Sequence, residues 1–389
     1  VKCVLQRVSL TTTDYSIFHT TTKHRICFID GCLDFKAKRF YTWDQIDFEY
    51  YPVVQVQMEF GEPCRDAMGD IVTKVLEPLF GEQLPLALRY LSRSIAGCIE
   101  DKNFATYLGN RNCGKGALFT LMKAFGDYVG AFPLKNILCE RNGKGGETAR
   151  DLYWLMEFEF MRIAISQEIP EELVGMKLKS ETVKKICSGG DTQIARRNYD
   201  KRDTHFEVEA SLLMMGNHPI GMDGDVLEHH LGFGSAVQYK TQDFIDQVRA
   251  EHGDLAVKKY RVADPNIKGE CSSLKWRLAF IHLLYESFTE EQITVETEVN
   301  VSNPLLAQFN EGWVITGDKE DIVLASDMDY LGKKWKDELK MMGVEHKKCK
   351  TKEFRNKWVF IGIRRKEAEP VAGVCPPPRP DEGAGPQMI

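Results

Sequence analysis

A glycine-rich loop with a single lysine is the part of this chain best suited to chemistry. In such a loop the backbone N–H groups, together with the start of the following helix, face phosphate groups, and the lysine neutralises the outer phosphates. The segment reads Gly109-Asn110-Arg111-Asn112-Cys113-Gly114-Lys115-Gly116, followed by Ala117. These residues form a candidate site for a nucleoside triphosphate, with Lys115 on its β- and γ-phosphates.

The last position of the loop departs from the usual pattern. A Ser or Thr normally follows the lysine, and its hydroxyl binds Mg²⁺, whereas this chain has Gly116. The flanks fit the pattern, because residues 104–108 are apolar and predict a strand, and residues 117–125 predict a helix. We therefore expect a strand, loop and helix that bind ATP, with one usual metal ligand missing.

Two later apolar segments end in polar side chains that suit such a site. The segment 162–168 predicts a strand ending at Glu168, a carboxylate that can hold Mg²⁺ or orient the attacking water. The segment 211–217 predicts a strand ending at Asn217, an amide that can contact the γ-phosphate or the water. The alternatives are a surface glutamate and an asparagine that stabilises the turn before Pro219.

Basic residues gather between these two segments. A predicted helix ends in Lys184 and Lys185, and a glycine turn then leads to further cations. Such a run is often only a solvated surface, but a row of cations also grips the phosphates of single-stranded DNA. The candidates for this contact are Lys184, Lys185, Arg196, Arg197, Lys201 and Arg202.

Composition sets the limits for the rest of the chain. Its 389 residues are enough for two or three domains, and a net charge of −6 does not by itself indicate nucleic-acid binding. No apolar run reaches the roughly 18 residues that span a membrane, so no membrane partner is expected. Eleven cysteines without a Cys-x-x-Cys pair favour an intracellular location. Because the chain begins at Val1 rather than Met, we expect it to be part of a longer product.

The order of predicted elements indicates the fold class. Apolar strands near 160–165 and 211–216 alternate with helical segments near 147–157 and 179–187, which predicts an α/β fold with a mostly parallel sheet. Residues 25–35 predict two strands around a turn at Asp30-Gly31. Helical periodicity is predicted for 66–99 and again for 243–290.

The segment from Lys333 to Lys366 has a charge balance unlike the rest of the chain. It holds thirteen Lys or Arg and four Asp or Glu, an excess that favours a polyanionic partner. A predicted helix followed by two strands is typical of a winged helix, which contacts DNA phosphates; the alternative is a lysine-rich solubilising surface. The candidate DNA-binding residues here are Lys347, Lys348, Lys350 and Lys352.

These segments predict a division of the chain into six parts. They are a β-rich segment at 1–60, a helical segment at 61–100, the nucleotide-binding core at 101–242, a helical connector at 243–295, the winged-helix-like module at 296–366 and a Pro/Gly-rich disordered tail at 367–389.

The order of these motifs resembles that of superfamily 3 helicases. The glycine–lysine loop, Glu168, the Lys185 to Arg196 stretch and Asn217-His218-Pro219 follow one another as in the primase–helicase (pox-type NTPase) branch of large DNA viruses and phages. The Lys185 to Arg196 stretch is the most specific of these, because unrelated phosphate-loop enzymes lack it. The resemblance covers roughly residues 20–366.

This resemblance implies an AAA+ core that assembles into a homo-hexameric ring. Such a ring hydrolyses ATP with Mg²⁺ and moves along single-stranded DNA as a helicase in viral or phage-type replication. Lys115, Glu168 and Asn217 would be its catalytic residues, with Glu168 at the metal. The implied partners are an upstream primase domain or other replication proteins, at a viral replication site in the host cytoplasm or nucleus.

One departure from the family concerns the arginine finger. The family carries arginine shortly after the Asn strand, where it reaches the neighbouring subunit's nucleotide, but this chain has His229 and His230 there. Histidine is mostly uncharged at neutral pH. Either another arginine, such as Arg196 or Arg197, takes the role, or hydrolysis is slow. The alternative function is therefore a nucleotide-dependent DNA-binding or assembly factor with weak ATPase activity.

Overall fold

The chain divides into two compact units, Val1–Ala307 with Lys334–Met341, and Gln308–Lys333 with Met342–Ile389. The computed structural model describes residues 23–46, 52–138, 152–168, 176–187, 189, 191–196, 203–218, 220–222, 224–235, 237–252, 254–295, 313–315, 322–324, 345–348, 358–361 and 363–365. No helix among these residues has the length and apolar character needed to cross a membrane.

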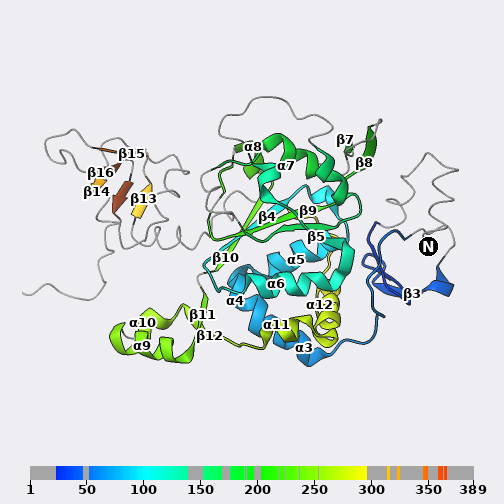
Figure 1. Cartoon of the computed structure of the whole chain (residues 1–389), viewed down its shortest axis with the longest axis horizontal. Helices are drawn as coiled ribbons and strands as arrows, with labels where there is room; N and C mark the ends of the chain where they lie inside the picture. The colour runs from blue at the N-terminus through cyan, green and yellow to red at the C-terminus, as the bar shows by residue number, and fades with distance from the viewer. Residues whose placement is uncertain are drawn as a thin grey trace, which may run out of the picture. The chain divides into compact units, whose positions relative to one another are not determined.

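A five-stranded parallel sheet forms the centre of the larger unit (Figure 1). Its order is β10 (His230–Ser235), β4 (Phe104–Gly109), β9 (Ser211–Gly216), β6 (Ile163–Ser166) and β5 (Val129–Ala131), and every neighbouring pair is parallel. The three central strands are nearly continuous runs of buried residues, as expected when both faces are covered. The predicted α/β fold with a mostly parallel sheet is confirmed.

Side chains that alternate along each strand supply two separate cores. Tyr107 and Met215 belong to a core on one face, whereas Phe104 and Met214 belong to a core on the other. Helices on both faces cover these cores, with α7 and α8 on one side and α5 and α6 on the other in Figure 1. The apolar pattern thus fixes which face each helix covers.

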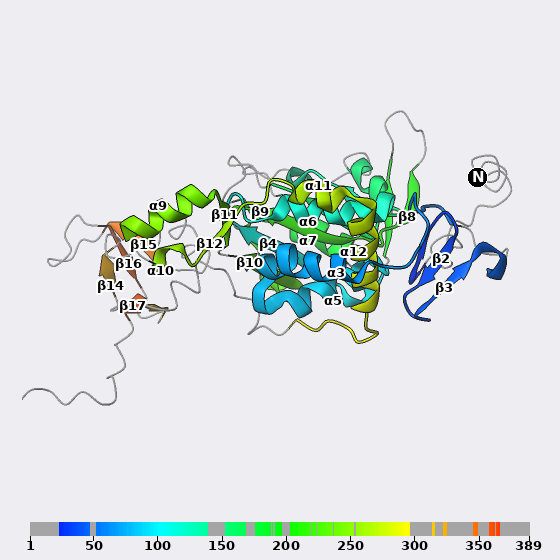
Figure 2. The ribbon, with the colours of Figure 1, turned by 90° about the horizontal axis from the view of Figure 1, so that it is seen from below.

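Within the described residues, six helices pack on the face that contains Tyr107. They are α3 (Arg65–Ile71), α4 (Glu77–Phe80), α5 (Leu84–Ile95), α6 (Lys115–Met122), α11 (Ile267–Ser272) and α12 (Leu274–Glu286), and a π-helical turn, Val72–Leu76, joins α3 to α4. From below, in Figure 2, α12 lies beside α3, α5 and α6, and α11 contacts α6. Segments almost 200 residues apart in sequence therefore share one core.

The opposite face is covered by shorter elements. They are a 3₁₀ helix (Tyr153–Phe158), α7 (Ser180–Ile186) and α8 (Gly224–Leu227), and the antiparallel pair of β7 (Thr192–Ala195) and β8 (Thr204–Glu207) belongs to the same region. The helix predicted at 147–157 is present over its described part as this 3₁₀ helix. Residues 147–151 lie outside the described residues.

The predicted helical run at 243–290 is also interrupted. Between α9 (Gln242–His252), α10 (Asp254–Val257) and α11, the chain forms β12 (Tyr260–Val262), which pairs in parallel with β11 (Gln238–Lys240). Aromatic and β-branched residues favour extended structure, and pairing with β11, about 20 residues earlier in the chain, stabilises this strand. This strand pair borders the cavity discussed below.

The amino-terminal sheet has three strands where two were predicted. β1 (Arg25–Cys27) and β2 (Gly31–Asp34) form the predicted hairpin, and β3 (Arg39–Thr42) adds an antiparallel partner. Gly31 is required there, because a Cβ on it would lie 2.1 Å from the Tyr41 carbonyl oxygen.

The smaller unit is described only in its strands. β14 (Ile322–Leu324), β16 (Trp358–Ile361) and β15 (Glu345–Lys348) form one antiparallel sheet, and β13 (Trp313–Ile315) pairs with β17 (Ile363–Arg365). The two strands predicted between Lys333 and Lys366 correspond to β15 and β16. The helix predicted from Lys333 lies outside the described residues, so the winged-helix assignment stays a prediction.

A buried ion pair joins α5 to the 3₁₀ turn Ile99–Asp101, which precedes β4. The Arg93 side chain is 1% exposed, its Nε and Nη2 donate to Asp101 at 2.6 and 2.7 Å, and its Nη1 donates to the Thr289 carbonyl at 2.7 Å. Burial is the largest single influence on the pKa of Arg93 and lowers it. The side-chain hydrogen bond to Asp101 acts in the opposite direction, and the pKa is raised overall.

We expect Asp101→Ala to lower the free energy of unfolding by about 3–5 kcal/mol, because it leaves a buried guanidinium without its carboxylate. Glu100→Gln is the matched control: this neighbour is 34% exposed, lies 3.4 Å from Arg93, and should cost less than about 1 kcal/mol. Urea unfolding followed by circular dichroism measures both. Equal losses in the two variants would contradict the assignment.

Candidate functional site

The glycine loop connects the carboxyl end of β4 to the start of α6. Gly114 has a φ of +105° and immediately precedes Lys115, the first residue of the helix. That backbone conformation is unfavourable for a residue with a Cβ, so Gly114 lets the chain turn directly into α6. The turn brings the amino end of α6, with its backbone N–H groups, to the same place as the loop.

Gly109 is required for a different reason. A Cβ at this position would lie 2.6 Å from the Cys113 sulfur, and Cys113 is only 1% exposed. The loop therefore folds back on its first residue, with the small Cys113 side chain filling the space between them. This packing fixes the position of Cys113 against the end of β4.

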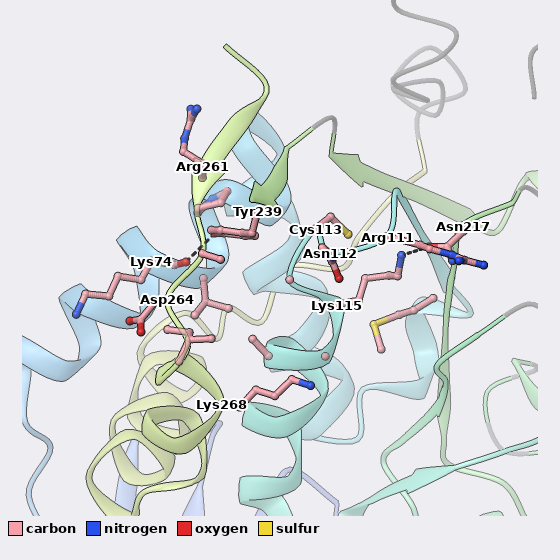
Figure 3. A pocket seen from close by; sticks show the side chains of 18 of the residues that line it. Lys74, Arg111, Asn112, Cys113, Lys115, Asn217, Tyr239, Arg261, Asp264 and Lys268 are labelled. Carbon is pink, nitrogen blue, oxygen red and sulfur yellow. Dashed lines mark hydrogen bonds between the residues drawn. The ribbon is translucent and has the colours of Figure 1, made fainter. Parts of the chain in front are cut away.

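The Lys115 ammonium lies where two strand ends meet. It donates to the Gly109 carbonyl at 2.6 Å, to the Gly216 carbonyl at 3.3 Å, and to Asn217 Oδ1 at 2.5 Å (Figure 3). It also contacts the Asn110 carbonyl at 3.3 Å. Lys115 and Asn217, which lie 102 residues apart in sequence, are therefore direct partners.

A cavity of about 1550 Å³ opens at this edge of the sheet. Its first wall is the loop from Arg111 to Ala117, and its floor is formed by residues at the ends of β6 and β9, namely Gln167, Glu168, Asn217 and His218. In parallel sheets, ligands bind at the carboxyl ends of the strands. The structure thus brings the three predicted catalytic residues to one cavity, whereas Gly109 and Asn110 are not among its lining residues.

The second wall was not predicted from the sequence. Tyr239 donates its backbone N–H to the Asn112 carbonyl at 2.8 Å, and its hydroxyl donates to the Lys74 carbonyl at 3.0 Å. Its ring also lies 3.6 Å from the position of a Cβ on Gly114. Burial raises the pKa of Tyr239, which keeps the phenol protonated. The other lining residues of this wall include Thr73, Lys74, Arg261, Asp264, Ile267 and Lys268.

No motif in the sequence marked this second wall. Its residues come from the π-helical turn, from β11 and β12, and from α11, each of which contributes between one and three side chains without a characteristic spacing. Only the packing of α11 against α6 and of Tyr239 against the loop places them opposite Lys115.

The donor set at the cavity bears on the implied Mg²⁺. Among the described residues no group of three His, Cys, Asp or Glu side chains is placed to hold a metal. Mg²⁺ is usually held by one or two carboxylates together with substrate phosphates and water. Glu168 supplies one such carboxylate at the cavity, so the residues present fit a metal that takes its other ligands from the nucleotide and solvent.

The described basic candidates of the larger unit, Lys184, Lys185 and Arg196, do not line this cavity. Lys184 and Lys185 are in the last turn of α7, where they line a separate cavity of about 370 Å³ with Lys102 and His229. Lys185 pairs with Glu181 at 2.9 Å, and Arg196 pairs with Asp203 at 2.6 Å. Lys347 and Lys348 are exposed on β15 in the smaller unit. Arg197, Lys201, Arg202, Lys350 and Lys352 lie outside the described residues.

His230 is a buried residue of the sheet. It begins β10, its Nε2 lies 2.7 Å from Thr106 Oγ1, and burial lowers its pKa to about 4. The ring is therefore neutral at physiological pH and is enclosed by the larger unit. His230 cannot take the place of an arginine finger, and His229 lines the smaller cavity beside Lys102 and Lys184.

Comparisons with known proteins gave distant structural neighbours. No protein-family model matches the chain, and no curated protein matches it. A solved A-form apo structure of the C-terminal region of NrS-1, a phage primase–helicase, has 14% identity and a TM-score of 0.39, covering 64% of this chain and 55% of that one. An apo structure of NrS-1 305–718 has 12% identity and a TM-score of 0.38, covering 78% and 79%.

Identities and TM-scores this low carry no argument about the family or activity of this chain. The matched region spans about half the length of the first of these neighbours. The roles proposed below therefore rest on the residues of this chain and their geometry.

The buried His230 makes stability depend on pH. Because its folded pKa is about 4 and its ordinary value is 6.5, only the unfolded chain takes up this proton between those values. We expect the free energy of unfolding to fall by up to about 3 kcal/mol from pH 6.5 to 4 on account of this residue. His230→Gln should flatten that slope in urea unfolding, whereas His205→Gln, at an exposed position, should not. An unchanged slope in His230→Gln would refute this.

Proposed function

We propose that this chain binds ATP in the cavity at the carboxyl ends of β4, β6 and β9 and hydrolyses it to move along single-stranded DNA. The observation that carries the proposal is the contact of Lys115 with Asn217 beside Glu168. A cation, an amide and a carboxylate from three separate segments converge on one cavity. A glycine loop leading into a helix supplies backbone N–H groups at the same point.

The present contacts of Lys115 suggest how nucleotide binding changes the site. Three backbone carbonyls and Asn217 now satisfy its ammonium. Phosphate oxygens carry more negative charge than carbonyls, so the ammonium would exchange these partners for the β- and γ-phosphates. Asn217 would then be free to contact the γ-phosphate or the attacking water, which links nucleotide binding to the end of β9.

Glu168 is the proposed group that positions the attacking water. It is exposed at the cavity, two residues beyond β6, and so can reach solvent and the outer phosphate. When bound, Mg²⁺ would neutralise part of the charge on the phosphates. Positioning and electrostatic stabilisation account for most of the catalysis in phosphoryl transfer, and these are the functions that Lys115, Asn217 and Glu168 would perform.

The DNA-binding part of the proposal rests on charge and on exposed side chains. Lys184 and Arg196 in the larger unit, and Lys347 and Lys348 in the smaller one, present cations at the surface. We place the activity in viral or phage-type replication, in a ring of six copies, with a primase or other replication proteins as partners.

A second candidate function is a nucleotide-dependent DNA-binding or assembly factor with little turnover. It is favoured by Gly116, which lacks the metal-binding hydroxyl, and by His230, which is buried and neutral where the helicase family has arginine. Arginine fingers are worth about 10³–10⁵ in rate. ATPase assays with and without single-stranded DNA, together with strand displacement, separate the two functions.

We expect Lys115→Ala to lower ATP hydrolysis by about 100-fold or more, because it removes the cation from the phosphates. Lys123→Ala is the matched control: this lysine follows α6, and its ammonium lies 4.7 Å from the centre of the Phe119 ring, not in the cavity. Hydrolysis measured by phosphate release should be unchanged in the control. Full activity in Lys115→Ala would refute the proposed site.

We expect the smaller unit to contact both phosphates and bases. Trp358 is 52% exposed on β16, opposite Lys348, and His346 stacks on it with ring centres 4.8 Å apart. Trp358→Ala should weaken single-stranded DNA binding by about 1–3 kcal/mol without changing its salt dependence. Lys348→Ala should reduce the salt slope by about 0.7.

Fluorescence anisotropy across a salt series measures both effects, with Lys135→Ala, an exposed lysine in the larger unit, as the control. Identical binding by all three variants and the unaltered chain would show that this face does not contact DNA.

A further inference from the structure

Gly116 differs from the other glycines of the loop because the fold does not require it. Gly114 has a positive φ, and a Cβ on Gly109 would overlap Cys113. A Cβ on Gly116 would instead lie 3.7 Å from Lys268 Cε and 3.9 Å from Lys268 Nζ, which is ordinary van der Waals contact. Backbone geometry therefore does not explain why the hydroxyl residue is missing, and the neighbouring side chain is Lys268.

Lys268 reaches this position from a different part of the chain. It lies on α11, which packs against α6, and its side chain extends toward the start of α6 in Figure 3. Its residue is exposed and lines the same cavity as Lys115. Within the described part of the chain its ammonium makes no hydrogen bond or ion pair, although Asp264 lies in the same cavity lining.

We propose that Lys268 binds the triphosphate where a hydroxyl-bound metal ion would otherwise stand, so that Gly116 and Lys268 act as a pair. This inference rests on the proposed nucleotide site and extends it. An ammonium beside Gly116 places a second positive charge at the start of α6, in the same cavity as the Lys115 ammonium. Two lysines, rather than one lysine and a loop-bound metal, then neutralise the outer phosphates.

Electrostatics and space both support the pairing. An ammonium at this point repels a divalent cation from the loop side of the phosphates, and it supplies charge-assisted hydrogen bonds to the same oxygens. A glycine leaves the space beside Lys268 Cε and Nζ open, and a side chain at 116 would occupy part of it, since its Cβ alone would already be in contact with both atoms. The glycine at position 116 is thus matched by the Lys268 cation on α11.

The pairing has a consequence that can be measured without turnover. ATP binding by the unaltered chain should depend little on Mg²⁺, with affinities in Mg²⁺ and in EDTA within about threefold of each other. Lys268→Met should weaken ATP binding in EDTA by about tenfold or more, the scale of one lost charged hydrogen bond. Binding of AMP should change little, because AMP lacks the β- and γ-phosphates.

The double variant tests the pair directly. Gly116→Ser with Lys268→Met exchanges the cation for a hydroxyl, so it should regain ATP affinity in Mg²⁺ but not in EDTA. Lys268→Arg should keep most of the binding in both conditions, because it retains the charge. Lys275→Met is the matched control, an exposed lysine on α12 that does not line the cavity. Isothermal titration calorimetry measures all of these, and thermal melting checks that each variant is folded.

The outcomes separate this inference from the proposed function. Unaltered ATP binding by Lys268→Met in EDTA overturns the role of Lys268, while loss of binding in Lys115→Ala still supports the nucleotide site. Loss of ATP binding by the unaltered chain in EDTA also overturns the pairing, because it shows that the metal is required. Failure of the unaltered chain to bind ATP under either condition overturns both.

Discussion

The parallel pairing of β4 with β9 is the constraint on which the site depends. Leu108 lies opposite Gly216 in this register, so the glycine loop and Asn217 leave the sheet at the same edge. The Lys115 ammonium then bridges the two strand ends through carbonyls of both. A shift of one residue in this pairing would also exchange the faces on which Tyr107 and Met214 pack. Packing in the two cores therefore fixes the register of β4 and β9, and this register places Lys115 and Asn217 together.

Buried and exposed ionisable groups have different surroundings in the larger unit. Buried charges are paired within short reach, as in Arg93 with Asp101 and Arg162 with Glu209, because an unpaired charge in the core would be costly. The cavity at the strand ends instead keeps exposed charges, Glu168 and Lys268 among them, where solvent or a ligand can meet them. The buried His230 also avoids an unpaired charge, because burial lowers its pKa and the ring remains neutral.

The three glycines of the loop illustrate why one residue type can carry different meanings. Gly109 is required because a Cβ there would overlap Cys113, and Gly114 is required by its positive φ. Gly116 instead lies beside Lys268, which belongs to a helix about 150 residues later in the chain. A sequence pattern treats the three alike. The first two follow from the loop's own geometry, whereas the third depends on how α11 packs against α6.

The sequence by itself determined the strand–loop–helix unit, the parallel sheet and the two polar residues at the strand ends, Glu168 and Asn217, because local periodicity and glycine placement are properties of neighbouring residues. It did not determine the second wall of the cavity, the interruption of 243–290 by β12, or the burial of His230. Those features arise when segments distant in the chain pack together. Tyr239 and Lys268 carry no motif, and only the packing of their elements against the loop and α6 brings them opposite Lys115.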